Sequence, residues 1–298
     1  MQVLYDRAEG PQGGVLTMGT FDGVHRGHTR LLQEALQLAQ QERTFVEVWV
    51  YHPHPREILR GERVPLLTTL SERLRLLEEQ GVGVVRVVSF TPDIARLSAA
   101  QFVSEWIQAL SGPVRLVLGY DHHFGQGREG DAEFLRARGL IVEEVPPISE
   151  GGTPISSSRI RRLIQEGQME VARQLLGYSY FIEGRVEKGR QMARHLGTPT
   201  ANIPWPSEKV SPPPGVYAGK VYILMEGGGA WPALLYLSPQ ALLEAHLLQW
   251  KGDSLYGAPL RVEFRAFIRP HEEGLQEEEV RARIREDLLR VQAYWQRP

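Results

Sequence analysis

The stretch VLTMGTFDGVHRGH, residues 15–28, and the amphipathic segment that follows it decide the fold of this chain. Its first four residues are apolar and predict a buried strand, whereas the apolar residues of 29–41 recur at helical spacing. A glycine-containing turn joins the two. A strand, a turn and a helix start together direct backbone N–H groups and the positive end of a helix dipole at one point, which favours phosphate binding.

His25 and His28 lie three residues apart, so they share one side of the first helical turn. There both rings can donate hydrogen bonds to phosphate oxygens, and Gly27 lets a ligand approach the backbone. The stretch contains neither a Walker A loop nor a G-x-G-x-x-G turn, so it predicts a different kind of nucleotide site. Two other interpretations compete: a metal site, which the nine His of the chain would permit, and an unrelated pair of solvated side chains.

The ten residues GTFDGVHRGH, 19–28, resemble the G-x-F-D-G-V-H-x-G-H signature of bacterial FAD synthetases, which belong to the nucleotidyltransferase superfamily. The resemblance implies that His25 and His28 are catalytic and hold phosphates during FMN adenylylation. It also implies that other residues of the stretch bind ATP, namely Gly19, Phe21, Asp22 and Gly27.

The rest of the first half predicts repeated strand–helix–strand units. Short β-branched or aromatic runs alternate with segments of helical periodicity, which is typical of a doubly wound, mostly parallel sheet. The predicted strands are residues 45–51, 84–90, 114–118 and 140–145, and the predicted helices include 70–80 and 99–110. Polar clusters follow several strands, and ligands bind at that edge of open α/β sheets, so we expect one site there.

One of these clusters, ISSSRIRR at residues 155–162, places serines at a predicted helix start and Arg161 about one turn later. From the residues alone, an ordinary capped helix with a solvated arginine competes with a second phosphate-binding helix start. The segment is similar to the S-S-T-x-I-R motif of FAD synthetases. This resemblance implies that Ser156, Ser157 and Arg161 bind the phosphates of ATP.

Two more segments at strand ends, P-H-P and G-Y-D-H-H-F-G, resemble further parts of the same family. The first implies that Pro53 and His54 bind the flavin, and the second that Asp121 binds ATP. His122 and His123 depart from the aromatic and basic residues that are usual in the second segment, so Asp121 is the safer assignment.

Composition limits the remaining possibilities. The 298 residues suffice for one large domain or two ordinary ones, and 42% hydrophobic with 23% charged residues is typical of a globular protein. A formal net charge of −2 argues against a nucleic-acid partner, and the RNA-linked H-x-G-H proteins are disfavoured for the same reason. The absence of Cys excludes disulfides and fits a cytoplasmic location. No run approaches the roughly 18 apolar residues of a membrane span, so we expect no membrane partner.

Beyond residue 178 the helical periodicity gives way to strands joined by turns, which predicts a second domain. The predicted strands are residues 180–188, 215–225, 231–237 and 260–269, with a helix over 275–295. Short antiparallel strands favour a closed β-barrel, because closure covers their edges. The strand 260–269 alternates, and five apolar residues are expected on one face: Leu260, Val262, Phe264, Ala266 and Ile268. The predicted domains are residues 1–178 and 179–298.

The second domain also carries candidate chemistry. Thr200 and Asn202 offer a hydroxyl and an amide two residues apart, which point the same way in an extended segment and suit a Mg²⁺–phosphate unit. Glu244 is a carboxylate in a largely apolar run. These features resemble the riboflavin kinase pattern, which implies that Glu244 is the catalytic base, that Gly189 binds the ATP of the kinase and that Tyr256 binds the flavin.

With both halves considered, the chain resembles the bacterial enzymes that phosphorylate riboflavin to FMN and adenylylate FMN to FAD. The resemblance implies riboflavin, FMN and ATP as small-molecule partners, and Mg²⁺ as cofactor; it leaves the oligomeric state open. Ala193, Thr198 and the shortened segment 235–240 depart from the kinase pattern. The alternative is therefore a monofunctional FMN adenylyltransferase whose barrel only binds or senses flavin.

Overall fold

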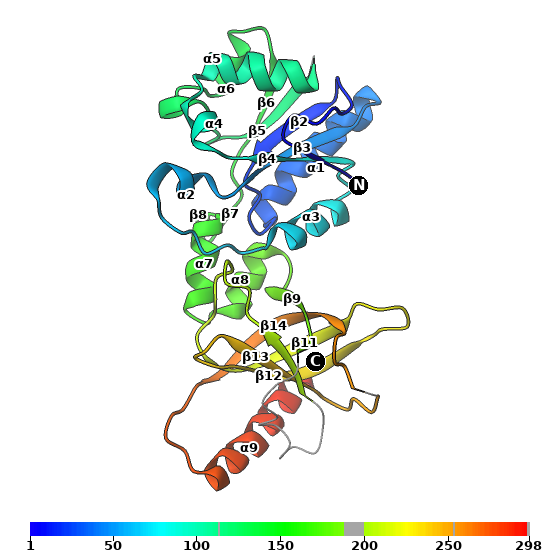
Figure 1. Ribbon diagram of the computed structural model, residues 1–298, viewed down its shortest axis with the longest axis vertical. Coiled ribbons are helices and arrows are strands. Elements are labelled where there is room, and N and C mark those ends of the chain that lie inside the picture. Colours follow the sequence, from blue (N-terminus) through cyan, green and yellow to red (C-terminus); the bar gives the residue numbers. More distant parts are fainter. Residues whose placement is uncertain (113, 188–199, 253, 297–298) are drawn as a thin grey trace. The chain divides into compact units, whose positions relative to one another are not determined.

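The computed structural model describes residues 1–112, 114–187, 200–252 and 254–296 (Figure 1). The chain forms two compact units, residues 1–157 and 158–298. The predicted boundary, after residue 178, lies two helices further along the chain. These helices, α7 (Ser157–Gln165) and α8 (Met169–Leu176), fall almost wholly in the second unit, where α8 packs against strand β14 (Pro259–Pro270).

The first unit is built on a six-stranded sheet in the order β1-β4-β3-β2-β5-β6, and every neighbouring pair is parallel. Its strands are β1 (Gln2–Tyr5), β2 (Val15–Gly19), β3 (Val46–His52), β4 (Val84–Ser89), β5 (Arg115–Gly119) and β6 (Ile141–Val145). The chain runs from β2 outward to β3 and β4, and then returns to the other side of β2 with β5. This confirms the doubly wound sheet, and its topological switch point lies at the end of β2.

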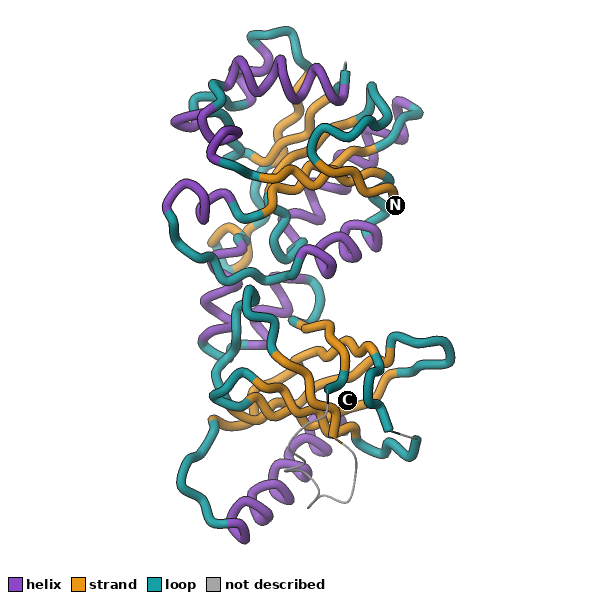
Figure 2. Tube along the Cα trace, viewed as in Figure 1, coloured by secondary structure: helices purple, strands orange, loops and turns teal. Residues whose placement is uncertain are grey.

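Helices cover the sheet of the first unit (Figure 2). They are α1 (Arg26–Glu42), α2 (Pro55–Arg60), α3 (Leu70–Glu79), α4 (Pro92–Arg96), α5 (Ala99–Phe102), the π-helical η1 (Val103–Ser111), the short η2 (Gln126–Arg128) and α6 (Ala132–Arg136). A two-stranded hairpin follows, β7 (Ser149–Glu150) and β8 (Thr153–Pro154). The helix predicted over 99–110 is therefore present, but it widens from α-helical to π-helical winding at Val103. None of the described helices has both the length and the apolar character needed to cross a bilayer.

A buried ion pair links the central strands to the chain that follows β1. Arg86 on β4 donates from Nε to Glu47 on β3 over 2.8 Å, and both side chains are almost completely shielded from solvent. Glu47 also accepts hydrogen bonds from the Trp49 indole and the Ser111 hydroxyl, each at 3.0 Å. A second guanidinium nitrogen of Arg86 donates to the backbone carbonyl of Ala8 over 2.7 Å. The pair thus fixes three segments at once.

The second unit is an antiparallel six-stranded sheet in the order β10-β13-β12-β11-β14-β9. Its strands are β9 (Phe181–Arg185), β10 (Thr200–Pro204), β11 (Gly215–Ile223), β12 (Ala230–Leu237), β13 (Leu242–Leu247) and β14 (Pro259–Pro270). The sheet curls until its first and last strands approach each other, and an isolated bridge between Glu187 and Asn202 joins the two ends. This nearly closed barrel, with α9 (Glu277–Trp295) packed on β11, β12 and β14, confirms the predicted architecture.

The predicted alternation of β14 is wrong beyond Phe264. The pairing of β14 with β11 shifts register twice, between Val216 and Tyr217 and between Ala218 and Gly219. Each bulge turns the following side chains to the opposite face. Phe264 and Phe267 therefore both contact Tyr217, with ring centroids 5.1 Å apart in each case. Ala266 and Ile268 instead pack with Val216 and Val291 in the cluster beneath α9, on the outer face of the barrel.

Replacing Arg86 by Met should reduce the free energy of unfolding by about 3–5 kcal/mol, because the carboxylate of Glu47 would stay buried without its cation. Urea denaturation of the two proteins measures the difference. The matched control is Arg96→Met, which removes an arginine whose side chain is 74% exposed and 3.6 Å from Asp93. That change should cost less than about 1 kcal/mol. Equal losses in the two variants would show that burial of the Arg86–Glu47 pair does not matter.

Candidate phosphate-binding and kinase sites

The loop between β2 and α1 adopts an unusual backbone conformation. Phe21, Gly23 and Val24 have φ angles of 47°, 82° and 33°, all in the left-handed region. Glycine enters this region freely, but each of the other two residues is held there at a cost of roughly 1–3 kcal/mol. Such a conformation persists only where the surrounding structure fixes it, so the loop requires strong anchors.

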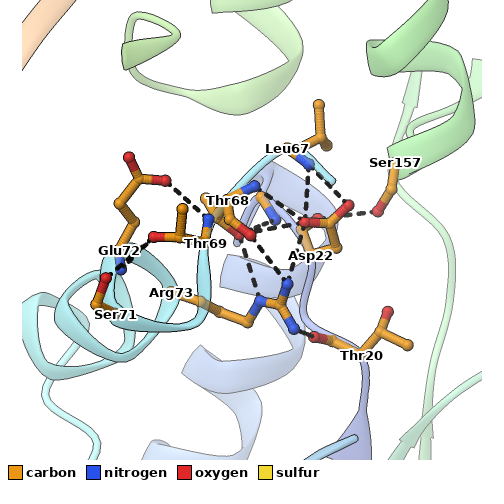
Figure 3. Close-up of polar contacts among 10 residues, drawn as sticks. Thr20, Asp22, Leu67, Thr68, Thr69, Ser71, Glu72, Arg73 and Ser157 are labelled. Carbon is orange, nitrogen blue, oxygen red and sulfur yellow. Dashed lines mark hydrogen bonds and ion pairs between the residues drawn. The ribbon is translucent and has the colours of Figure 1, made fainter. Parts of the chain in front are cut away.

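The main anchor is the carboxylate of Asp22, which is completely buried. It accepts hydrogen bonds from the backbone N–H groups of Leu67 and Thr68, at 3.0 and 3.1 Å, and from the Thr68 hydroxyl at 3.2 Å (Figure 3). The guanidinium of Arg73 donates to the same carboxylate at 3.3 Å. Asp22 therefore holds the loop in place, and the contact with ATP that the resemblance implies stays a prediction.

Further hydrogen bonds attach the same loop on both sides of Asp22. Arg73, on the first turn of α3, donates to the backbone carbonyl of Thr20 over 2.8 Å, and the Thr68 hydroxyl accepts from the backbone N–H of Gly23 over 3.1 Å. The Ser157 hydroxyl donates to the backbone carbonyl of Asp22 over 2.9 Å (Figure 3). Sequence reasoning missed Arg73 and Thr68, because a buried pair separated by about fifty residues leaves no local pattern.

His25 is the N-cap of α1, and its Nδ1 accepts a hydrogen bond from the backbone N–H of His28 over 3.3 Å. Because Nδ1 is an acceptor, the neutral ring carries its proton on Nε2, the nitrogen suited to donate to an anion. The rings of His25 and His28 stack in parallel, with centroids 3.7 Å apart and planes inclined by 14°. The two imidazoles thus form one rigid unit at the helix start.

The pKa of His28 lies well below the ordinary value of 6.5, first because the ring is buried and then because His25 and Arg73 lie nearby. His28 is therefore neutral at pH 7. Its Nδ1 is shielded from solvent and bonds to no residue that the structure describes. Phe21, itself buried, supports the ring from a centroid distance of 5.2 Å. A neutral His28 does not repel the ring of His25 at this close range, and it can hold an anionic oxygen.

The glycines of the motif serve this packing. A Cβ atom on Gly27 would lie 3.1 Å from the ring of His25, and one on Gly19 would lie 3.4 Å from the ring of Phe21. The contact at Gly27 is tight, so a side chain there would displace the ring of His25, whereas the distance at Gly19 is at the limit of ordinary van der Waals contact. The predicted approach of a ligand to Gly27 is compatible with this packing role.

Three other residues predicted for this site, Pro53, His54 and Asp121, lie in loops that follow β3 and β5, on the same edge of the sheet. Pro53 precedes α2, and His54 caps that helix by accepting from the backbone N–H of Arg56 over 3.2 Å. Asp121 is exposed, and its backbone carbonyl bonds to the ring of His123 over 2.9 Å. Ser156 immediately precedes α7. Arg161, which is buried, belongs to α7 and so to the second compact unit.

His122 occupies a shielded position beside Phe124, with ring centroids 6.3 Å apart. Burial lowers the pKa of its imidazole from 6.5 to about 4, and the neighbouring Asp121 only partly opposes this shift. His122 is thus a neutral ring at pH 7, in keeping with the aromatic residue that is usual at this position of the motif.

In the barrel, strand pairing places three of the predicted kinase residues next to one another. Asn202 on β10 pairs with Glu244 on β13, and Thr200 pairs with His246. Paired residues of antiparallel strands point to the same face, here the outer face that α9 partly covers. The Glu244 carboxylate makes no hydrogen bond or ion pair with any residue of 1–112, 114–187, 200–252 or 254–296, and burial raises its pKa. A half-buried carboxylate of this kind is suited to accept a proton.

Two predicted kinase residues are not gathered in this way. Gly189 lies outside the described residues. Tyr256 is 60% exposed in the loop between β13 and β14, where its backbone N–H bonds to the hydroxyl of Ser254.

Within the described part of the chain, no three His, Cys, Asp or Glu residues cluster closely enough to hold a metal ion. The metal interpretation of His25 and His28 therefore lacks a third ligand of these types there. The Thr200 hydroxyl and the Asn202 amide offer hard oxygen donors, which fit Mg²⁺ when phosphate oxygens complete its coordination.

Comparison with known proteins gives the same division of the chain. The sequence model of FAD synthetase matches residues 7–159, and that of riboflavin kinase matches residues 176–295. A bifunctional riboflavin kinase/FMN adenylyltransferase of Escherichia coli K12 is 35% identical over 98% of this chain and 96% of its own length. A protein of the same description from Bacillus subtilis is 33% identical over 86% of this chain and 84% of its own.

Among solved structures, a protein from Streptococcus pneumoniae described as a macrolide-efflux protein has the same fold over nearly the whole chain. Its TM-score is 0.87 with 25% sequence identity, and the match covers 98% of this chain and 99% of the other.

Replacing His122 by Phe should weaken the dependence of stability on pH. Because the folded pKa is about 4 and the unfolded value is 6.5, the unfolded chain binds the proton more readily, so stability is lost as pH falls below about 7. Phe keeps the ring and does not titrate. Its stability relative to the wild type should therefore rise by about 2 kcal/mol between pH 7 and pH 5, as measured by urea denaturation.

The matched control is His123→Phe at the neighbouring, exposed position, which keeps His122 in its shielded place and should therefore retain most of the pH dependence of the wild type. If the advantage of His122→Phe over the wild type is the same at both pH values, His122 does not titrate with a lowered pKa.

Proposed function

This chain belongs to the family of bifunctional riboflavin kinase/FMN adenylyltransferases, and we propose on that basis that it makes FMN from riboflavin and FAD from FMN. The observation that carries the proposal is the presence of two separate reactive clusters, one in each compact unit: the stacked pair His25 and His28, and Glu244 beside Asn202. Relatives with both activities in their name span nearly the full chain, which favours this function over a barrel that only senses flavin.

In the adenylylation reaction, a phosphate oxygen of FMN attacks the α-phosphorus of ATP, and the bond to pyrophosphate breaks. No general base is needed, because the attacking oxygen is already ionised; catalysis consists of positioning and charge stabilisation. We assign His25 and His28 to the phosphates in the transition state, His25 donating from Nε2. We assign Ser156, Ser157 and Arg161 to the leaving pyrophosphate.

The remaining assignments at this site follow the strand ends. Gly19, Phe21 and Gly27 shape the phosphate pocket through their packing against the two His rings. Asp121 binds the nucleotide, and Pro53 and His54 contact the flavin.

In the kinase reaction, the terminal ribityl hydroxyl of riboflavin attacks the γ-phosphorus of ATP and loses its proton, while the bond from the γ-phosphorus to the bridging oxygen breaks and ADP leaves. Glu244 takes this proton, a role that its raised pKa and its lack of a described partner support. Thr200 and Asn202 hold Mg²⁺ together with the phosphates, and the ion supplies charge stabilisation when bound. Gly189 contributes to ATP binding and Tyr256 to flavin binding.

We further propose that both reactions take place in the cytoplasm, with ATP and flavins as the partners of the chain and no nucleic acid or membrane involved. The small net charge of −2 and the absence of Cys support this assignment.

The function is tested by incubating the purified protein with ATP and Mg²⁺ and either riboflavin or FMN, and then separating the flavins by chromatography. Formation of FMN and FAD from riboflavin is expected. FAD from FMN, but no product from riboflavin, would select the monofunctional alternative.

His28→Ala should lower kcat/KM for FMN adenylylation by roughly 10²-fold or more, the scale for loss of one transition-state donor. Riboflavin phosphorylation by the same protein should stay unchanged and serves as the internal control. Because burial keeps His28 neutral, the wild-type adenylylation rate should show no loss of His28 function between pH 8 and pH 6.5. A rate within threefold of the wild type would remove His28 from the site.

Glu244→Gln should lower riboflavin phosphorylation by roughly 10²–10⁴-fold, because the amide cannot accept a proton. Adenylylation of supplied FMN should remain near the wild-type rate, since its nucleophile needs no base. Loss of both activities with an unchanged melting temperature would contradict the assignment of two sites. Loss of neither would show that Glu244 is a structural carboxylate.

A further inference from the structure

Glu244 has one neighbour on each adjoining strand of the outer barrel face. Asn202 on β10 lies on one side, and Tyr236 on β12 lies directly opposite on the other. The Cβ atoms of such antiparallel partners are about 4.5–5.5 Å apart on the same face of a sheet. Tyr236 therefore borders the space above the Glu244 carboxylate, where the substrate hydroxyl would have to arrive.

The side chain of Tyr236 is fixed at both ends. Its hydroxyl forms a 2.9 Å hydrogen bond with Nδ1 of His271, and the backbone N–H of His271 donates to the carbonyl of Pro214 over 3.0 Å. The ring packs against the apolar cluster beneath α9, which includes Leu234 and Val291. A side chain held by both a hydrogen bond and apolar packing presents one surface to its neighbours.

The charges around Tyr236 favour a neutral phenol. Burial raises the pKa of Tyr236, the nearby Glu244 carboxylate raises it further, and Arg269 opposes both. Arg269 is itself bound to Asp287 of α9, with guanidinium–carboxylate distances of 2.7 and 2.9 Å. Arg269 is thus engaged with α9, and Tyr236 offers Glu244 a neutral aromatic wall.

We propose that Tyr236 is a specificity-determining residue of the kinase half, in contact with riboflavin next to the hydroxyl that Glu244 deprotonates, and that His271 is the positioning residue that fixes it. This inference rests on the proposed kinase reaction. Its physical basis is that proton transfer requires the hydroxyl within hydrogen-bond reach of the base, so the residue walling that space sets the reactive geometry.

The first test compares Tyr236→Ala with the wild type. Loss of the wall should lower kcat/KM for riboflavin by about 10²-fold, the scale of a misplacement near 1 Å, while KM for ATP stays within about twofold. Adenylylation of FMN, which takes place in the other unit, should not change. A general loosening of the barrel would raise both KM values and lower the melting temperature, and this outcome would overturn the proposal.

The second test isolates the hydrogen bond between Tyr236 and His271. Tyr236→Phe and His271→Ala each remove it and keep a ring at position 236, so each should lower kcat/KM for riboflavin by about 3–10-fold. The double variant should be no worse than the single ones, because they share one interaction. Additive losses would overturn the role of His271.

The matched control is Tyr222→Phe, which removes a tyrosine hydroxyl near the far end of β11, where Tyr222 pairs with Ala230 and Arg261. It should leave riboflavin phosphorylation unchanged.

Glu244→Gln distinguishes the assignment of Glu244 as the base from the proposed role of Tyr236. If Glu244→Gln loses phosphorylation but Tyr236→Ala does not, Glu244 is the base and the proposed role of Tyr236 is overturned. If Glu244→Gln retains phosphorylation, the base assignment itself fails.

Discussion

The phosphate site depends on one buried interaction, the carboxylate of Asp22 with the backbone amides of Leu67 and Thr68 and the guanidinium of Arg73. The loop it holds contains two non-glycine residues in the left-handed region, Phe21 and Val24, which would relax if they were released. His25 follows Val24 directly, so the orientation of its ring is set by this anchor. The chemistry at the start of α1 is therefore built on a segment far away in the sequence.

The electrostatics of the site follow from the same arrangement. Without Arg73, the buried negative charge of Asp22 would strongly destabilise the folded protein, and it would also repel an anionic substrate. The ion pair removes both problems and leaves the stacked rings of His25 and His28 as donors, with His28 neutral. Positive character then comes from N–H groups and the helix dipole, which need no proton uptake to act.

The sequence predicted the parts of this molecule that depend on local patterns. In the first half, the structure contains the predicted buried strand before Gly19 and the predicted helix after it. The strands that alternate with helices along the sequence form the parallel sheet. Periodicity also predicted the antiparallel barrel and the helix that follows it. In the sequence, only the resemblance connected Asn202 with Glu244. The structure shows that the two residues pair across neighbouring strands.

What the sequence did not predict depends on distant contacts. The anchoring role of Asp22 was missed, because its partners Thr68 and Arg73 lie 46 and 51 residues away in the sequence. The faces of β14 were wrong, because bulges are set by the pairing with β11 and leave no mark in the alternation of Ala266 and Ile268. Neither feature breaks a local rule, so neither can be detected from composition or periodicity.

The pairing of β1 also has a consequence for how the protein is made. Among the residues that the structure describes, β1 pairs with β4 alone, and Arg86 on β4 binds the carbonyl of Ala8 just after β1. A chain leaving the ribosome therefore exposes its first strand until residue 89 has emerged. During that interval β2 and β3 can already pair, whereas β1 presents an open edge. An extension fused to Met1 would thus be attached to a late-docking part of this sheet.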